Sequence, residues 1–196
     1  IRLFYFDGIG WAEVPITARD EGANTITASG INAFGDFVIA GTNMSSYATV
    51  NVPILPGWNL VTVPVLAADM RKTTLFPGAS SAAFAYTNGY VQAETLKNGK
   101  AYWLKYPSTQ TIPISGLKVS PKTVSVVVGW NLVGVFESDV LVSQITSTPG
   151  GIISSQFYGY SNGYNSATTL VSGKGYWVKV KENGTLDLPV SKMKVK

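Results

Sequence analysis

The sequence predicts an all-β fold in which a small antiparallel β module occurs twice in tandem. Three observations support this prediction. Four sequence blocks recur in the same order after residue 50, the side chains in these blocks sort onto two faces with the period of two that strands impose, and tight-turn residues separate the blocks. Hydrophobic residues make up 45% of the chain and charged residues 13%. Burial therefore drives the fold, and Ser, Thr, Asn and Gly cover much of its surface.

The N-terminal segment, residues 1–46, does not share the repeat. Its pattern predicts strands near 1–6, 11–16, 24–29 and 36–41, with a linker from Thr42 to Ser46. Four short strands fall below the roughly seven of a complete sandwich. We therefore expect this segment to complete a sheet with something outside the chain or to pack on the repeats. The chain begins at Ile1, inside a predicted strand, and we expect it to be part of a longer precursor.

The repeat divides the remainder into two modules, residues 47–120 and 121–196. The first contains PGWNLVTVPV (56–65), FAYTNGY (84–90), TLKNGKAYWLK (95–105) and TIPISG (111–116). The second contains VGWNLVGVF (128–136), FYGYSNGY (157–164), TLVSGKGYWVK (169–179) and TLDLPV (185–190). Asn-Gly and Gly-Lys pairs mark the turns between blocks. The segments 66–83 and 137–156 are the only places predicted for a short helix or an irregular loop.

The side chains that share a strand face with each aromatic residue of the repeat predict whether it packs in a core or contacts a ligand or partner. Both faces of the GWN strands are apolar, which predicts central strands covered on both sides, with Trp58 and Trp130 in the repeat core. Tyr102 and Tyr176 are also expected in that core, because they share a face with apolar residues.

A second group of aromatic residues is predicted to contact a ligand or partner. Trp103 and Trp177 share their face with a lysine, so we expect them to be partly exposed or to lie under a neighbouring loop. Tyr90 and Tyr164 follow the Asn-Gly turns and are expected to be exposed. Flat aromatic rings of this kind can stack on sugars, but they also fill cores and mark protein interfaces.

Residue composition argues against catalysis. The chain has no Cys and no His, which removes thiolate chemistry, the usual general base near neutral pH and the commonest metal ligand. The carboxylates Glu94, Glu137 and Asp139 form no convincing pair for glycoside hydrolysis. We therefore predict that the protein is not an enzyme, and we expect no cofactor and no metal site.

Charge and hydropathy argue against two kinds of partner, nucleic acid and the membrane interior. The net charge is +4, but the lysines are dispersed and form no nucleic-acid-binding arm. No apolar run is long enough for a membrane span. Sequons at Asn43 and Asn183 are candidate glycosylation sites, which agrees with an exported protein at the cell surface or outside the cell.

Two stretches resemble parts of large secreted surface proteins of bacteria and archaea. LFYFDGIGWAEVPI followed by NTITASGINAFGDFVIAG resembles the closing strands of an immunoglobulin-like β-sandwich. The two repeats resemble the GWNLV…GYWVK modules near the C-termini of such multidomain proteins. The resemblance implies an exported, modular and non-catalytic role in display, adhesion or assembly, and it transfers no catalytic residue.

Two hypotheses for function follow. In the first, the chain is an extracellular structural or adhesion segment of a cell-surface or filament-forming protein. It would assemble through β-sheet edges with the upstream part of its precursor or with neighbouring copies. In the second, it is a carbohydrate-binding module of a secreted enzyme, with Trp103, Trp177, Tyr90 and Tyr164 as the sugar-stacking platform. Deep burial of both Trp103 and Trp177 would end this second hypothesis.

Overall fold

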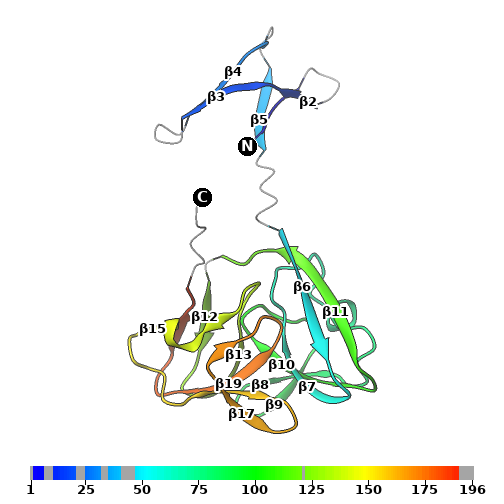
Figure 1. Cartoon of the computed structure of the whole chain (residues 1–196), viewed down its shortest axis with the longest axis vertical. Helices are drawn as coiled ribbons and strands as arrows, with labels where there is room; N and C mark the ends of the chain where they lie inside the picture. Colours follow the sequence, from blue (N-terminus) through cyan, green and yellow to red (C-terminus); the bar gives the residue numbers. More distant parts are fainter. Residues whose placement is uncertain are drawn as a thin grey trace. The chain divides into compact units, whose positions relative to one another are not determined.

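The computed structural model describes residues 2–6, 11–20, 25–31, 35–40, 47–120 and 122–189. More than half of the described residues lie in antiparallel strands and very few lie in helices, so the predicted all-β class is confirmed (Figure 1). The chain divides into two compact units, unit 1 (Ile1–Ser46) and unit 2 (Tyr47–Lys196). The predicted linker, Thr42 to Ser46, lies outside the described residues.

Unit 1 contains two small antiparallel sheets. Strand β1 (Arg2–Phe6) lies between β2 (Trp11–Val14) and β5 (Asp36–Ala40), and β3 (Ile16–Asp20) pairs with β4 (Thr25–Ala28). The structure thus has five strands where the sequence predicts four, because the chain after β2 continues into a second strand. The immunoglobulin-like character of this segment stays a prediction.

The first repeat is built from a four-stranded and a two-stranded sheet. The larger sheet has the order β7-β10-β8-β9, from β7 (Gly57–Thr62), β10 (Ala101–Tyr106), β8 (Ala83–Tyr86) and β9 (Tyr90–Ala93). The smaller sheet pairs β6 (Tyr47–Ile54) with β11 (Gln110–Leu117) along their whole length. Strand β7 lies at the outside of its sheet, so the prediction of a central strand is wrong.

The second repeat has an equivalent four-stranded sheet but a larger second sheet. Its four-stranded sheet has the order β13-β19-β16-β17, from β13 (Gly129–Gly134), β19 (Gly175–Val180), β16 (Phe157–Tyr160) and β17 (Tyr164–Ala167). Its second sheet places β20 (Gly184–Asp187) between β12 (Thr123–Val126) and β15 (Thr146–Thr148). A short pair, β14 (Val140–Leu141) with β18 (Thr169–Leu170), completes the module.

The helical residues lie in the two segments for which the sequence predicts a short helix or an irregular loop. The helix α1 (Lys72–Leu75) falls within 66–83, and the 3-10 turn η2 (Val142–Gln144) falls within 137–156. The second of these segments also contains β14 and β15, which were not predicted. No helix among the described residues is long and apolar enough to cross a membrane.

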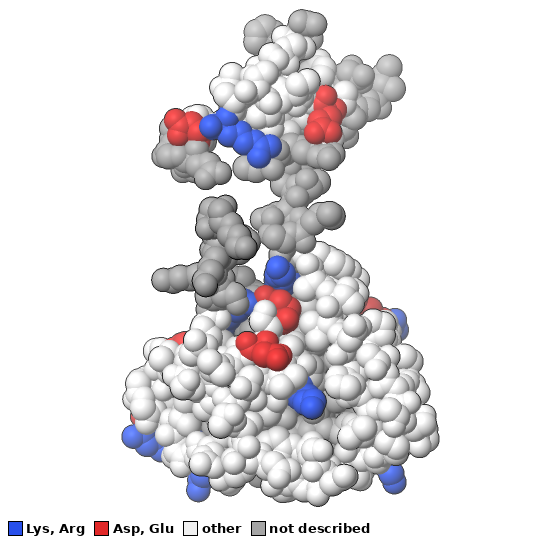
Figure 2. Space-filling model, in the orientation of Figure 1, with Lys and Arg blue, Asp and Glu red and all other residues white. Residues whose placement is uncertain are grey.

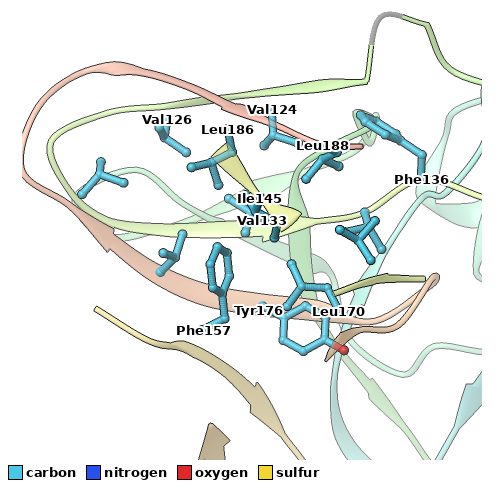
Figure 3. Close-up of a cluster of buried hydrophobic side chains, with 14 of the residues drawn as sticks. Val124, Val126, Val133, Phe136, Ile145, Phe157, Leu170, Tyr176, Leu186 and Leu188 are labelled. Atoms are coloured by element: carbon cyan, nitrogen blue, oxygen red, sulfur yellow. The ribbon is translucent and has the colours of Figure 1, made fainter. Parts of the chain in front are cut away.

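Each repeat encloses its own hydrophobic core between its two sheets. In the first repeat Ile54, Val63, Leu96 and Leu104 are fully buried. In the second, side chains such as Val126, Phe157 and Leu186 converge from both sheets (Figure 3). Apolar residues alternate with exposed ones along β6 and β12, which is the signature of strands with one face on a core.

The Gly and Asn of the GWN motif are the first and third residues of β7 and β13 and hold the turn that precedes each strand. Gly57 and Gly129 have φ of 89° and 94°, a backbone conformation that favours glycine. The Asn131 amide accepts the Val127 N–H at 3.0 Å and donates to the carbonyls of Val127 and Gly129 at 2.7 and 3.0 Å. Asn59 makes the equivalent three bonds in the first repeat.

The two repeats meet through equivalent edges of their larger sheets. Thr62 N–H donates to the Gly173 carbonyl at 3.0 Å, and Gly134 N–H donates to the Gly99 carbonyl at 3.2 Å. Gly134 occupies the position of Thr62 in the second repeat, and Gly173 that of Gly99. One contact therefore occurs twice about an internal, approximate twofold axis, as in a symmetric dimer.

Candidate functional site

The aromatic residues gather in two clefts beside the junction of the repeats. The first cleft has a volume of about 400 Å³, and the second about 500 Å³. Both fall within the size range of ligand-binding pockets, roughly 300–1,000 Å³. All the described residues at their walls are aromatic. Those of the first cleft are Trp58, Phe84, Tyr90, Trp103, Tyr160 and Tyr164, and those of the second are Tyr86, Trp130, Tyr158, Tyr164 and Trp177.

The internal axis relates the two clefts ring by ring. Trp58 packs edge-on against Trp103 with centroids 6.4 Å apart, and Trp130 packs likewise against Trp177 at 6.1 Å. Each buried indole is also met by a tyrosine of the opposite repeat at 4.8 Å, Tyr160 on Trp103 and Tyr86 on Trp177. Both clefts therefore need both repeats, since the floor and one wall come from different copies.

Trp58 and Trp130 are the exposed indoles of the clefts. Their exposed fractions are 43% and 40%, so the prediction that they belong to the repeat core is wrong. The physical reason is that the contact between the repeats covers this sheet face at Leu60 and Leu132 but leaves the start of each strand, where the tryptophan lies, open. The turn itself is held by the neighbouring Gly and Asn, and the Trp side chain is available for contact.

Trp103 and Trp177 form the floors of the clefts. They are 8% and 9% exposed, and they pack with Leu60, Ala101 and Leu132 between the two repeats. The expectation of partial exposure is wrong, because the face they share with a lysine is covered by the other repeat and not by a loop. As exposed stacking platforms these two indoles are excluded.

Tyr90 and Tyr164 are exposed, as expected, at 56% and 57%. Each begins the strand after an Asn-Gly turn, in which Asn88 and Asn162 have φ of 56° and 51°. These hairpins project the two tyrosines at the mouths of the clefts. Tyr164 lines both clefts.

The first cleft contains a polar group without a partner. The Trp103 Nε1 atom is buried and has no hydrogen-bond partner in the described structure. Burial raises the pKa of Tyr90, and Tyr164 adds to the rise, whereas the nearby Trp103 side chain lowers it. The Tyr90 hydroxyl is thus the group that the Trp103 N–H influences, and the buried nitrogen is not exposed to a ligand in the cleft.

The surroundings of the clefts carry isolated positive charges. Lys105 and Lys179 are the direct cross-strand neighbours of Trp58 and Trp130, and both are exposed. Figure 2 shows one face of unit 2, on which basic side chains stand singly between wide uncharged areas. A neutral ligand suits these clefts better than a cation, which would approach a lysine on the same sheet face.

Tyr102 and Tyr176 lie in the cores, as predicted, at 3% and 4% exposed. Their hydroxyls accept the backbone N–H groups of Lys97 at 2.8 Å and Val171 at 2.7 Å. Burial raises the pKa of both hydroxyls. These tyrosines hold the turn before β10 and β19 and do not reach the clefts.

The remaining predicted sites lie elsewhere. Asn43 is outside the described residues. Asn183 is exposed, and its Oδ1 accepts the Val128 N–H at 2.8 Å. Among the carboxylates, Glu137 pairs with Lys122 and Asp139 accepts the Ser172 N–H. No group of three or more acidic side chains in the described part of the chain could hold a metal ion.

Sequence reasoning missed Tyr86, Tyr160, Phe84 and Tyr158 as cleft residues. A signal for two of them was present, because Tyr86 and Tyr160 sit four residues before Tyr90 and Tyr164 and pair with them across the hairpin. Cross-strand partners share a face. The exposure of Tyr90 and Tyr164 therefore brings their partners to the same surface, at centroid distances of 5.6 and 5.5 Å.

Comparison of the chain with protein-family models, with curated proteins and with solved structures finds no match.

Proposed function

We propose that the chain is a non-catalytic adhesion segment of an exported protein that binds neutral carbohydrate in its two aromatic clefts. The observation that carries this proposal is the pair of exposed indoles, Trp58 and Trp130, each above a cleft walled by aromatic rings. An indole offers a flat apolar face on which the C–H groups of a pyranose can stack. The carbohydrate hypothesis drawn from the sequence relied on Trp103 and Trp177 and fails, because both indoles are buried; the present proposal relies on the exposed Trp58 and Trp130 instead.

Polar groups at the rims support a sugar over a purely apolar ligand. Tyr90, Tyr160 and Tyr164 can donate or accept hydrogen bonds through their hydroxyls. Pockets that combine apolar walls with a few placed polar groups are typical of small-molecule recognition.

Export is proposed on different grounds. The low share of charged residues, the polar uncharged surface and the resemblance to secreted surface proteins all support it. The tandem repeat supports a structural role in the same protein, because the clefts depend on a rigid junction between two β modules.

The test is binding of the purified full chain to an array of neutral glycans. We expect binding that Trp58→Ala and Trp130→Ala each weaken and that the double variant abolishes. Tyr47→Ala is the matched control, since Tyr47 is 55% exposed, lies on β6 and lines neither cleft. Each variant must keep the circular dichroism and melting temperature of the parent.

Three outcomes would overturn the proposal. One is the absence of binding to any neutral glycan. Another is glycan binding that survives the double tryptophan substitution. The third is selective binding of an oligoproline peptide or of choline, the other ligands that aromatic grooves and cages accept.

Assembly through sheet edges is a second candidate function, supported by β9 and β17. Each is the outer strand of its four-stranded sheet, and Val91 on β9 is 45% exposed. Unpaired outer strands can add a strand from a neighbour. Analytical ultracentrifugation checks this directly: concentration-dependent association that Val91→Lys weakens supports edge assembly, and a monomer at all concentrations rejects it.

A further inference from the structure

The two clefts are adjacent parts of one surface. Tyr164 lines both of them, and Tyr90 lies close enough to Tyr164 to affect its own titration. A continuous band of rings therefore runs from Trp58 across the paired hairpin tyrosines to Trp130. A ligand that leaves the first cleft past Tyr164 enters the second.

We propose that the two clefts act together as one site for an unbranched neutral oligosaccharide long enough to cover both. This inference rests on the proposed function and specifies its ligand, a chain polymer with stacking units in both clefts. Trp58 and Trp130 are the outer stacking positions, and Tyr164 is the shared central one.

The internal axis determines which contacts one oligosaccharide can make in both clefts. A twofold rotation reverses direction, so an oligosaccharide, whose two ends differ, runs through the second cleft in the direction opposite to its direction in the first. Stacking depends on the faces of the rings, and a sugar can stack on an indole in either sense. Hydrogen bonds depend on direction, and a donor that is satisfied in one cleft is not satisfied by the same atom in the other.

Simultaneous use of two clefts has a measurable signature. Once one part of the chain is bound, the other part is held at high effective concentration near the second cleft. Affinity should therefore rise steeply at the length that first reaches both clefts. Linked sites typically gain on the order of 100-fold or more over single ones.

The experiment is isothermal titration calorimetry of the full chain with neutral oligosaccharides from disaccharide to hexasaccharide. The probes are the series of β-1,4-linked glucose, xylose, mannose and N-acetylglucosamine and of β-1,3-linked glucose. In the series that binds, we expect two short ligands per chain and one long ligand per chain, with the affinity rising at the change of stoichiometry. Trp58→Ala and Trp130→Ala should each return the affinity for the long ligand to about that of the short one.

Two results would overturn this inference and leave the proposed function standing. One is an affinity that does not change with ligand length. The other is a stoichiometry of two for long as well as short ligands, because the clefts are then independent. Failure of every series to bind rejects the proposed function as well. Tyr47→Ala is the control for the loss of an exposed aromatic ring outside the clefts.

Discussion

Thr62 on β7 fills the space that Gly134 on β13 leaves empty, although the two residues occupy equivalent positions of the two repeats. A Cβ atom on Gly134 would overlap the side chain of Thr62. The same relationship occurs between Ala101 and Gly175, where an added Cβ would lie 2.5 Å from that of Ala101. At each place close to the internal axis one repeat carries a side chain and the other has none. Two identical copies of either repeat could not pack in this way.

We therefore expect Gly134→Ala to destabilise unit 2 by about 1–3 kcal/mol, the usual effect of overpacking a close contact. Urea denaturation measures the change. Gly150→Ala is the matched control, since nothing lies within 4 Å of its added Cβ, and it should have little effect. In a double-mutant cycle, Thr62→Gly should remove part of the loss caused by Gly134→Ala. Strict additivity of the two substitutions would contradict the contact.

Within the GWN motif we expect Asn131 to contribute more than Trp130 to the free energy of unfolding. Asn131 is 4% exposed and makes three hydrogen bonds to the turn before β13, so Asn131→Ala should lower the free energy of unfolding by about 2–4 kcal/mol. Trp130→Ala should lower it by roughly 1–2 kcal/mol, because the indole is 40% exposed but loses its edge-on contact with Trp177. Thermal and urea unfolding of the two variants compare these effects. Equal losses would show that the tryptophan is structural and would weaken the case for a binding role.

Loss of the hydroxyl should change the free energy of unfolding in one direction at Tyr106 and in the other at two further buried tyrosines. Tyr106 is 1% exposed, and its hydroxyl has no hydrogen-bond partner in the described structure. Tyr106→Phe should therefore be neutral or stabilising by about 1 kcal/mol at pH 7. Tyr102→Phe and Tyr176→Phe should each cost about 1 kcal/mol, because each removes the acceptor of a backbone N–H. Destabilisation by all three substitutions would point to an unseen partner of Tyr106.

Tyr106 should also contribute to alkaline unfolding. Burial raises its pKa to about 12, whereas a tyrosine in an unfolded chain titrates near 10. Between these values the unfolded state binds fewer protons than the folded state, so the free energy of unfolding falls as pH rises through that window. Tyr106→Phe should flatten this fall, which urea titrations at pH 9 to 12 can measure (roughly the window between the two pKa values). An unchanged slope would show that other groups dominate.

Removal of one partner of the buried ion pair in the second repeat should lower the free energy of unfolding. Lys122 and Glu137 form a salt bridge with side chains 15% and 8% exposed, and Glu137 Oε2 has no further partner. Lys122→Met leaves a buried carboxylate without its cation, and we expect a loss of about 3–5 kcal/mol. The double variant with Glu137→Leu should recover most of it, because both charges are then gone. Calorimetric melting of the single and double variants distinguishes this from a simple packing defect, which would not be recovered.

The all-β class, the repeat and the turns follow from the sequence alone, because these are local properties. Alternation with period two, the Asn-Gly pairs and the glycines of the GWN motif act on neighbouring residues, and the structure shows strands and positive φ angles at these positions. The burial of Tyr102 and Tyr176 was predictable for the same reason, since their strand neighbours are apolar. Which tryptophans face solvent depends on the packing of the two repeats. Alternation can place Trp58 and Trp103 on a face of a sheet, but it cannot say whether that face is covered, and here the second repeat covers Trp103 and leaves Trp58 open. The clefts exist because the repeats meet about an internal axis, and that contact joins residues far apart in sequence whose relation no local pattern encodes.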